Sequence, residues 1–265
     1  MTLTMTSARA AGWMLLLLVL LLSGPLLTLA LGRVPLHGDW STATHRSAGL
    51  APDPAIHHEA VVQIYASRTF GWRGAFAVHT WLAAKPADAE RYTRYEVIGW
   101  NARGGRSAVS ISDRNAPDAE WYGAAPTLIK DLRGANAEAV VAKLTKAAAD
   151  YPYGKSYSAW PGPNSNTFIA YLGRAVPELR LDLPATAIGK DFIPGGLPAA
   201  MAPSGTGVQV SLFGLLGVMA GAEEGLELNV LSLTFGVDVK RPALKLPIVG
   251  RGRRSLAEAE PAHDR

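Results

Sequence analysis

The chain has 265 residues, of which 48% are hydrophobic and 18% are charged, and its formal net charge at pH 7 is +4. It contains no cysteine, which excludes a thiol nucleophile, disulfide bonds, cysteine-ligated zinc and iron–sulfur clusters. This net charge is too small to indicate nucleic-acid binding, so we expect no nucleic-acid partner.

An uncharged apolar segment runs from Ala10 to Gly32. At about 1.5 Å per residue in a helix, it is long enough to cross a bilayer, and membrane lipid is its expected partner. Arg9 precedes it and favours a cytoplasmic N-terminus, which would export the body. The alternative is a signal peptide cleaved before Arg33, because Ala30 and Gly32 are small residues suited to a cleavage site.

Residues 33–58 are predicted to be a linker, since small and turn-forming residues follow one another there with little periodicity. The folded body is expected to begin at Glu59. His57 and His58 precede this glutamate, but no second histidine follows at the spacing of a helical zinc motif. We therefore expect no metal site.

Four segments have the composition of β-strands, namely residues 59–67, 74–85, 92–100 and 107–112. The second of them alternates between two sets of side chains on opposite faces: Phe76, Val78, Thr80 and Leu82, and Ala77, His79, Trp81 and Ala83. Both faces are largely apolar, which is typical of a central strand.

The clearest helix is predicted within residues 135–154, where apolar residues recur at helical spacing. Asn136 is its expected N-cap, and Pro152 is expected to end it. A second helix is predicted from Thr167 to Leu172, ended by Gly173.

Residues 208–221 and 224–239 are predicted to form an antiparallel β layer. The first segment is apolar but too short to span a membrane, and the second alternates between apolar and polar residues. Six basic residues then follow with no acidic residue between them: Lys240, Arg241, Lys245, Arg251, Arg253 and Arg254. They are interpreted either as a contact for anionic lipid or cell-wall polymer or as a solvated tail.

The expected organisation has five parts. They are an anchor or signal segment (1–32), a linker (33–58), an α+β core (59–195), a β-rich extension packed on the core (196–250) and a basic disordered tail (251–265).

The stretch "WPGPNSNTFIAYLGR", Trp160 to Arg174, raises the main chemical question. Its prolines and glycine fix the chain direction before a helix and place Ser165 at or near the N-terminus of that helix. Free backbone N–H groups and the helix dipole would stabilise an oxyanion there. The alternative is a purely structural cap, because Asn164, Ser165 and Asn166 are all preferred N-cap residues.

Much of the body resembles an uncharacterised bacterial family of membrane-anchored proteins that carry a domain of unknown function. The matching segments are AVVQIYASRTFGWRGAFAVHTW, YTRYEVIGW, YPYGKSYSAWPGPNSNTF, IGKDF and EGLELNVLSLTFG. With the apolar segment, the resemblance implies a bacterial inner-membrane protein with a single N-terminal span and a periplasmic body. It implies no activity and no cofactor.

A more distant resemblance implies chemistry. "FAVHTW" and "PNSNTFIAYL" are similar to the histidine strand and the nucleophile helix of circularly permuted papain-like proteins, relatives of cell-wall peptidases and of lecithin–retinol acyltransferase. The resemblance implies a papain-like core in which His79 is the general base and Ser165 takes the place of the family's cysteine. Because a serine hydroxyl is not ionised in advance, His79 would have to accept its proton during attack.

Other residues are expected to complete this site. Glu96, or Asn101 as the second choice, would hold the imidazole ring. The cleft and the oxyanion position would be formed by Asn164, Asn166, Thr167 and Trp81.

Two functions remain open at this point. The first is a serine-dependent amide or ester hydrolase or acyltransferase of the cell envelope that uses Ser165 and His79. The alternative is a catalytically inactive papain-like module that binds lipid or peptidoglycan.

Overall fold

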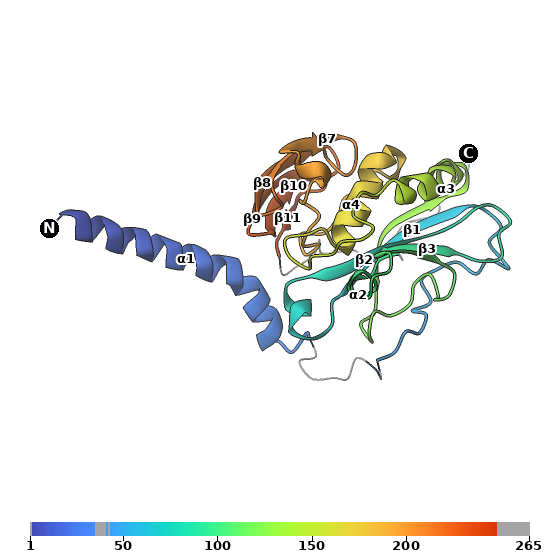
Figure 1. Ribbon diagram of the computed structural model, residues 1–265, viewed down its shortest axis with the longest axis horizontal. Helices are drawn as coiled ribbons and strands as arrows, with labels where there is room; N and C mark the ends of the chain where they lie inside the picture. Colours follow the sequence, from blue (N-terminus) through green and yellow to red (C-terminus); the bar gives the residue numbers. More distant parts are fainter. Residues whose placement is uncertain (1, 35–40, 42, 248–265) are drawn as a thin grey trace.

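The computed structural model describes residues 2–34, 41 and 43–247. Figure 1 shows a long N-terminal helix that projects from a body of two antiparallel sheets, with a helix between the sheets. The predicted tail, residues 251–265, which includes Arg251, Arg253 and Arg254, lies outside the described residues.

The N-terminal helix α1 (Thr2–Ala30) contains a segment, Arg9–Ala30, that is long and apolar enough to cross a membrane. A signal sequence would satisfy the same criterion. The C-terminal part of α1 touches the body, and Leu21 is buried against Ile188 and Leu233. The first part of the span is exposed, so α1 is only partly covered by protein.

The first sheet has the strand order β4-β3-β2-β1-β5 and is antiparallel throughout. Its strands are β1 (Val61–Arg68), β2 (Val78–Lys85), β3 (Thr93–Val97), β4 (Val109–Ser112) and β5 (Thr127–Arg133). The first four confirm the predicted strands; each begins later than predicted, β3 ends earlier, and β1 ends one residue later. The sequence prediction missed β5, whose TLIKDLR sequence carries charged side chains that interrupt its apolar pattern.

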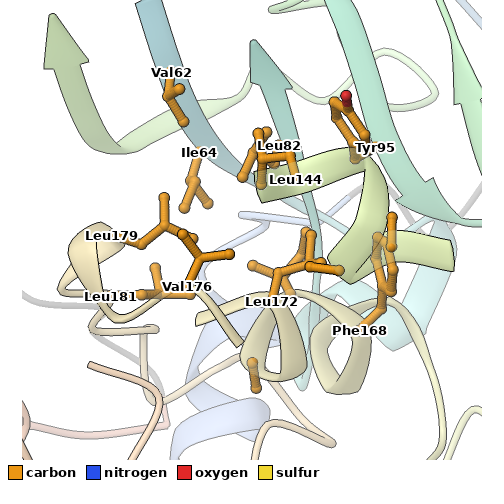
Figure 2. Close-up of a cluster of buried hydrophobic side chains, with 14 of the residues drawn as sticks. Val62, Ile64, Leu82, Tyr95, Leu144, Phe168, Leu172, Val176, Leu179 and Leu181 are labelled. Atoms are coloured by element: carbon orange, nitrogen blue, oxygen red, sulfur yellow. The ribbon is translucent and has the colours of Figure 1, made fainter. Parts of the chain in front are cut away.

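Two longer helices, α3 (Gly134–Ala149) and α4 (Ser165–Ala175), cover one face of this sheet. The short helical segments are η1 (Gly71–Ala75), α2 (Gly99–Arg103), η2 (Pro177–Leu179) and η3 (Pro194–Gly196). Figure 2 shows the core between sheet and helices, where Ile64, Leu82, Leu144, Phe168 and Leu172 are fully buried. Burying one such side chain contributes about 1.5–3 kcal/mol.

Three predicted helix boundaries are wrong, and one of them is the start of α4, which is Ser165 and not Thr167. Asn136 does not cap α3, because β5 leads directly into a helix that already begins at Gly134. Gly173 does not end α4 but lies buried inside it. A Cβ atom at Gly173 would come within 2.5 Å of the carbonyl oxygen of Pro203, so glycine permits close packing here.

The other face of the first sheet carries a second apolar cluster that includes Tyr65, Trp81 and Leu128. Residues within the predicted linker help to cover it. Asp118 is fully buried and accepts hydrogen bonds from the Ser47 hydroxyl at 2.7 Å and the Leu50 N–H at 2.6 Å. The part of the linker around these residues is therefore packed on the sheet.

The second sheet has the strand order β11-β10-β9-β8-β7-β6, so every strand pairs with its neighbours in sequence. Its strands are β6 (Ala199–Met201), β7 (Gly207–Leu212), β8 (Leu216–Gly221), β9 (Gly225–Val230), β10 (Leu233–Asp238) and β11 (Ala243–Lys245). The predicted antiparallel β layer is thus confirmed and gains β6 and β11.

The face that this sheet turns toward the body is polar. Gln209, Glu227, Asn229, Thr234 and Lys245 are buried there. Glu227 accepts hydrogen bonds from the Lys190 ammonium and, at 2.6 Å, from the Lys245 ammonium. Burial alone would raise the pKa of Glu227, but the two neighbouring ammonium groups outweigh burial and lower it.

This arrangement corrects the interpretation of the late basic residues as one group. Lys245 is buried and also bonds Asp182 at 2.7 Å. Lys240 is exposed and pairs with Glu223 at 2.9 Å, and Arg241 approaches the same carboxylate.

We predict that Glu227→Gln destabilises the protein by about 3–5 kcal/mol, because it leaves two buried ammonium groups without their shared counter-charge. The matched control is Glu178→Gln, which breaks the exposed ion pair with Lys143 and should cost at most about 1 kcal/mol. Denaturant unfolding of the full chain in detergent measures both. Equal effects would contradict the structural role of the buried network.

Candidate functional site

The helix start in the Pro-Gly-Pro-Asn-Ser-Asn motif is capped by Asn164. Its side-chain oxygen accepts hydrogen bonds from the N–H groups of Asn166 at 2.9 Å and Thr167 at 3.1 Å. The Thr167 hydroxyl in turn accepts from the Asn164 N–H at 3.1 Å, which completes a capping box. Of the three candidate caps, Asn164 is thus the one used.

Asn166 ties this helix start to two other parts of the chain. Its side-chain amide donates to the carbonyl oxygens of Val78 at 2.9 Å and Ile188 at 2.7 Å. Its side-chain oxygen accepts from the Thr80 hydroxyl at 2.8 Å. The motif therefore joins α4 to β2 and to the IGKDF segment.

The glycine of that segment is required by the same contacts. Gly189 has a φ of +96°, and a Cβ atom there would lie 2.3 Å from the Asn164 amide nitrogen. The Thr167 hydroxyl donates to the Gly189 carbonyl at 2.8 Å. PNSNTF and IGKDF are thus two halves of one packed junction.

The capping box also occupies the groups expected to form an oxyanion site. The N–H groups of Asn166 and Thr167 already donate to Asn164, so they are not free to stabilise a negative charge. Ser165, the first residue of α4, is only 4% exposed. Within the described residues, its hydroxyl has no hydrogen-bond partner.

The structure brings His79 and Glu96 together, as expected from their neighbouring strands. The His79 Nε2 and Glu96 Oε2 atoms are 3.3 Å apart, and Arg94 donates to the same oxygen at 3.0 Å. All three residues are buried. We call this group the His79–Glu96–Arg94 cluster.

Ser165 is not brought to this cluster. Thr80 contacts Asn166 on the helix-covered face of the first sheet, and adjacent side chains of a strand point to opposite faces. His79 therefore points away from α4, to the face where its ring stacks on that of Trp121.

The other two expected site residues have structural contacts. Trp81 is fully buried on the face of His79 and donates its indole N–H to the Pro117 carbonyl at 2.7 Å. Asn101 lies in α2 and accepts a hydrogen bond from Arg106 at 2.8 Å.

Burial controls the charge state of His79. It lowers the pKa of His79 and outweighs the opposing effects of the hydrogen bond and the charge of Glu96. Burial would raise the pKa of Glu96, but the His79 hydrogen bond and the Arg94 charge outweigh it and lower that pKa. At neutral pH the cluster therefore contains a neutral imidazole, a carboxylate and a guanidinium group.

Aromatic side chains overlie this cluster. The Trp121 ring stacks on the His79 ring with centroids 3.6 Å apart, and the Trp100 ring lies beside Trp121 at 6.0 Å. Tyr122 stands edge-on to both indole rings, at 5.1 and 5.8 Å. Trp100 is 49% exposed, so the group reaches the surface. We call Trp100, Trp121 and Tyr122 the aromatic platform.

Sequence reasoning missed the aromatic platform. Trp100 was assigned to the end of the predicted strand 92–100 but lies in α2, and Trp121 and Tyr122 lie in the loop before β5, outside every predicted strand. The available signal was the pair Trp121-Tyr122 followed by Gly123 in a segment without strand periodicity. Aromatic side chains in such a segment are candidates for a binding surface.

A surface depression of about 400 Å³ lies on the same side of the first sheet as Trp81, between residues 51–54 and 113–118. Its lining is rich in charged side chains, including Arg91 and Asp113, and contains none of the expected catalytic residues. Among residues 2–34, 41 and 43–247, no three His, Asp or Glu side chains are grouped closely enough to hold a metal ion.

Comparison with known proteins identifies the family. The profile of the family described as "Protein of unknown function (DUF3750)" matches residues 59–192, about half of the chain. The chain belongs to this family. No curated protein and no solved structure matches it. The matched region runs from just before β1 to Phe192, the last residue of the IGKDF segment, so it contains every expected site residue, while the second sheet lies beyond it.

We predict that Asn166→Asp destabilises the protein, because a carboxylate cannot donate to the Val78 and Ile188 carbonyl groups. Each buried group left unpaired costs about 1–3 kcal/mol. Ser165→Ala is the matched control and should change stability little. Thermal unfolding in detergent measures both, and a larger loss for Ser165→Ala would contradict this assignment.

The low pKa of His79 predicts a pH dependence. In the unfolded chain His79 takes up a proton near pH 6.5, whereas in the folded protein it does so only at lower pH. Its contribution to stability is thus present above about pH 6.5 and declines by up to about 1.4 kcal/mol per pH unit as the pH falls toward its folded pKa. His79→Gln should flatten this decline. An unchanged slope between pH 7 and pH 5 would contradict a neutral buried His79.

Proposed function

We propose that this protein is a membrane-anchored, non-catalytic module that binds the glycan strands of peptidoglycan through the aromatic platform. The observation that carries this proposal is an open aromatic surface over a buried, charge-balanced cluster. A sugar ring has an apolar C–H face and a polar edge, so it is suited to a surface where an exposed indole ring and partly exposed indole and phenol rings stand among polar groups.

Polar groups are present at the edge of the aromatic platform. His45 is exposed and lies edge-on to Tyr122 at 4.9 Å, and its Nδ1 atom is 3.2 Å from the Glu120 carbonyl oxygen. Arg106 is exposed, and its guanidinium is held by its bond to Asn101, the residue after Trp100. These groups could hydrogen-bond sugar hydroxyl or acetamido groups.

The His79–Glu96–Arg94 cluster supports this surface. Arg94 donates to the Ala116 carbonyl at 3.0 Å, and His79 supports the Trp121 ring from below. The cluster therefore fixes the loop that carries Trp121 and Tyr122. In this role the histidine needs no nucleophile, which agrees with its orientation away from Ser165.

The serine-dependent hydrolase or acyltransferase is the less favoured proposal. It requires Ser165, His79 and free helix N-terminal amides in one open cleft. The capping of α4 by Asn164 and the orientation of His79 both weigh against it. In the favoured, non-catalytic proposal, a papain-like core would serve only as a scaffold.

The proposed location is the bacterial inner membrane, with α1 as the single span and the body in the periplasm. The composition of Arg9–Ala30 supports an anchor, and Arg9 at the start of the span supports a cytoplasmic N-terminus. A periplasmic body would face the peptidoglycan layer.

The test is co-sedimentation of the detergent-solubilised full chain with purified peptidoglycan sacculi. Trp100→Ala should reduce the bound fraction, because it removes the most exposed ring of the platform. Trp72→Ala is the matched control, since Trp72 is 56% exposed but belongs to η1, outside the platform. Its bound fraction should equal that of the unaltered chain.

Two results would overturn the proposal. One is an equal bound fraction for Trp100→Ala and the unaltered chain. The other is covalent labelling by a fluorophosphonate probe that is lost in Ser165→Ala, which would restore the serine enzyme.

A further inference from the structure

The outer face of the second sheet is apolar, while its inner face is polar. Along β7, Val208, Val210 and Leu212 point outward and are exposed, whereas Gln209 and Ser211 point inward and are buried. In β9, Leu226 and Leu228 are exposed and Glu227 is buried. This is the reverse of a sheet with one face in water, where apolar residues point inward.

The pattern holds across all six strands. Cross-strand pairing places Val210 beside Val218, Val218 beside Leu228, and Leu228 beside Phe235. Every outward side chain of β6 to β11 is apolar: Ala199, Met201, Val208, Val210, Leu212, Leu216, Val218, Ala220, Leu226, Leu228, Val230, Leu233, Phe235, Val237 and Leu244. We call this surface the apolar sheet face. Contiguous exposed apolar surface of this kind marks an interaction site.

The apolar sheet face is continuous with α1. Leu21 of α1 packs with Leu233, and Val230 and Phe235 lie against the same cluster. These residues come from β9 and β10, close to the turn that joins the two strands. In Figure 1 the second sheet lies on the side of α4 toward which α1 projects.

The position of Leu21 along α1 indicates how deep in a membrane the contacting part of the sheet would lie. With a rise of 1.5 Å per residue, Leu21 lies about 14 Å from the Ala30 end of α1. The hydrocarbon core of a bilayer is about 30 Å thick. If Arg9–Ala30 crosses the bilayer, the body surface that contacts Leu21 lies within the hydrocarbon region.

We infer that the apolar sheet face is a second membrane-contacting surface, which inserts side chains of β7 to β10 into the outer leaflet of the bilayer that holds α1. The inference rests on the anchoring by α1 proposed above. The ligand class is the acyl region of phospholipids. Bilayer contact accounts for both faces of the sheet, because its polar groups bond to the body and its apolar groups meet lipid.

The inserting surface also has large residues at its loops. Phe213, in the turn between β7 and β8, is 67% exposed, and Leu231, between β9 and β10, is 50% exposed. The Trp160 indole N–H donates to the Leu231 carbonyl, and the ring is half exposed beside it. Tryptophan with a bonded N–H and an exposed ring is typical of the interface between lipid and water.

The absence of cysteine in the sequence allows a direct test by single-cysteine labelling. Val218→Cys and Leu228→Cys report on the apolar sheet face, and both positions are about half exposed. Val19→Cys reports on α1, where Val19 is 55% exposed. Lys146→Cys reports on α3 at a side chain that is 81% exposed. Each variant of the full chain carries a bimane label and is reconstituted in phosphatidylethanolamine–phosphatidylglycerol liposomes.

We expect nitroxide-labelled phosphatidylcholine in these liposomes to quench the labels at positions 218, 228 and 19 to a similar extent. Aqueous iodide should quench only the label at Lys146. The emission of the sheet labels should also shift to shorter wavelength relative to the protein in denaturant.

The remaining outcomes overturn the inference in distinguishable ways. Iodide quenching of the 218 and 228 labels, with lipid quenching at 19, would show an anchored protein whose sheet faces water. Sheet labels shielded from both quenchers would show that a protein surface, such as a second copy of the chain, covers the sheet. Loss of lipid quenching at position 19 as well would mean that the anchor itself, and with it the proposed location, is wrong.

Discussion

The side-chain amide of Asn166 is the contact on which the arrangement of the body depends. Its bonds to Val78, Thr80 and Ile188 join α4 to the central strand of the first sheet and to the segment that leads into the second sheet. A buried amide that hydrogen-bonds to several separate segments specifies how those segments are arranged, because moving any one segment would leave buried polar groups unpaired. The motif that first suggested a nucleophile therefore has an architectural role.

The same junction determines which side of the first sheet is available for function. Because α4 closes one face, the open aromatic surface lies on the other, above His79 and Glu96. That face is covered by loops, and loops held on a rigid sheet are common binding surfaces. The buried charges below are matched among themselves and with the backbone, which fixes the loop in place.

Much of the fold could be predicted from the sequence, because the segments that form β1 to β4 have strand composition and residues 224–239, which form β9 and β10, alternate between apolar and polar side chains. The pairing of His79 with Glu96 was also predictable once the two strands were placed side by side. The separation of Ser165 from His79 was not, because a resemblance in strand and helix order does not specify which face of the strand a side chain uses. A shift of one residue in register reverses that face.

The orientation of the second sheet also could not be predicted from its sequence. Alternation of apolar and polar residues predicts a two-faced strand, but it does not say which face meets the rest of the protein. Partners for the polar face come from elsewhere in the chain, such as Lys190, which bonds Glu227 from the segment after α4. Such distant ion pairs are formed only by the complete fold.

The meander order of the second sheet has a consequence for biogenesis. Since each of its strands pairs with the next in sequence, this sheet has only local contacts to form and can assemble quickly. Until the polar face has packed against Lys190 and the rest of the body, its buried charges lack their partners. During the same time the apolar face is exposed to water and is prone to self-association. If the chain is synthesised next to a membrane and α1 inserts first, the newly formed sheet stays close to lipid until it has packed against the body.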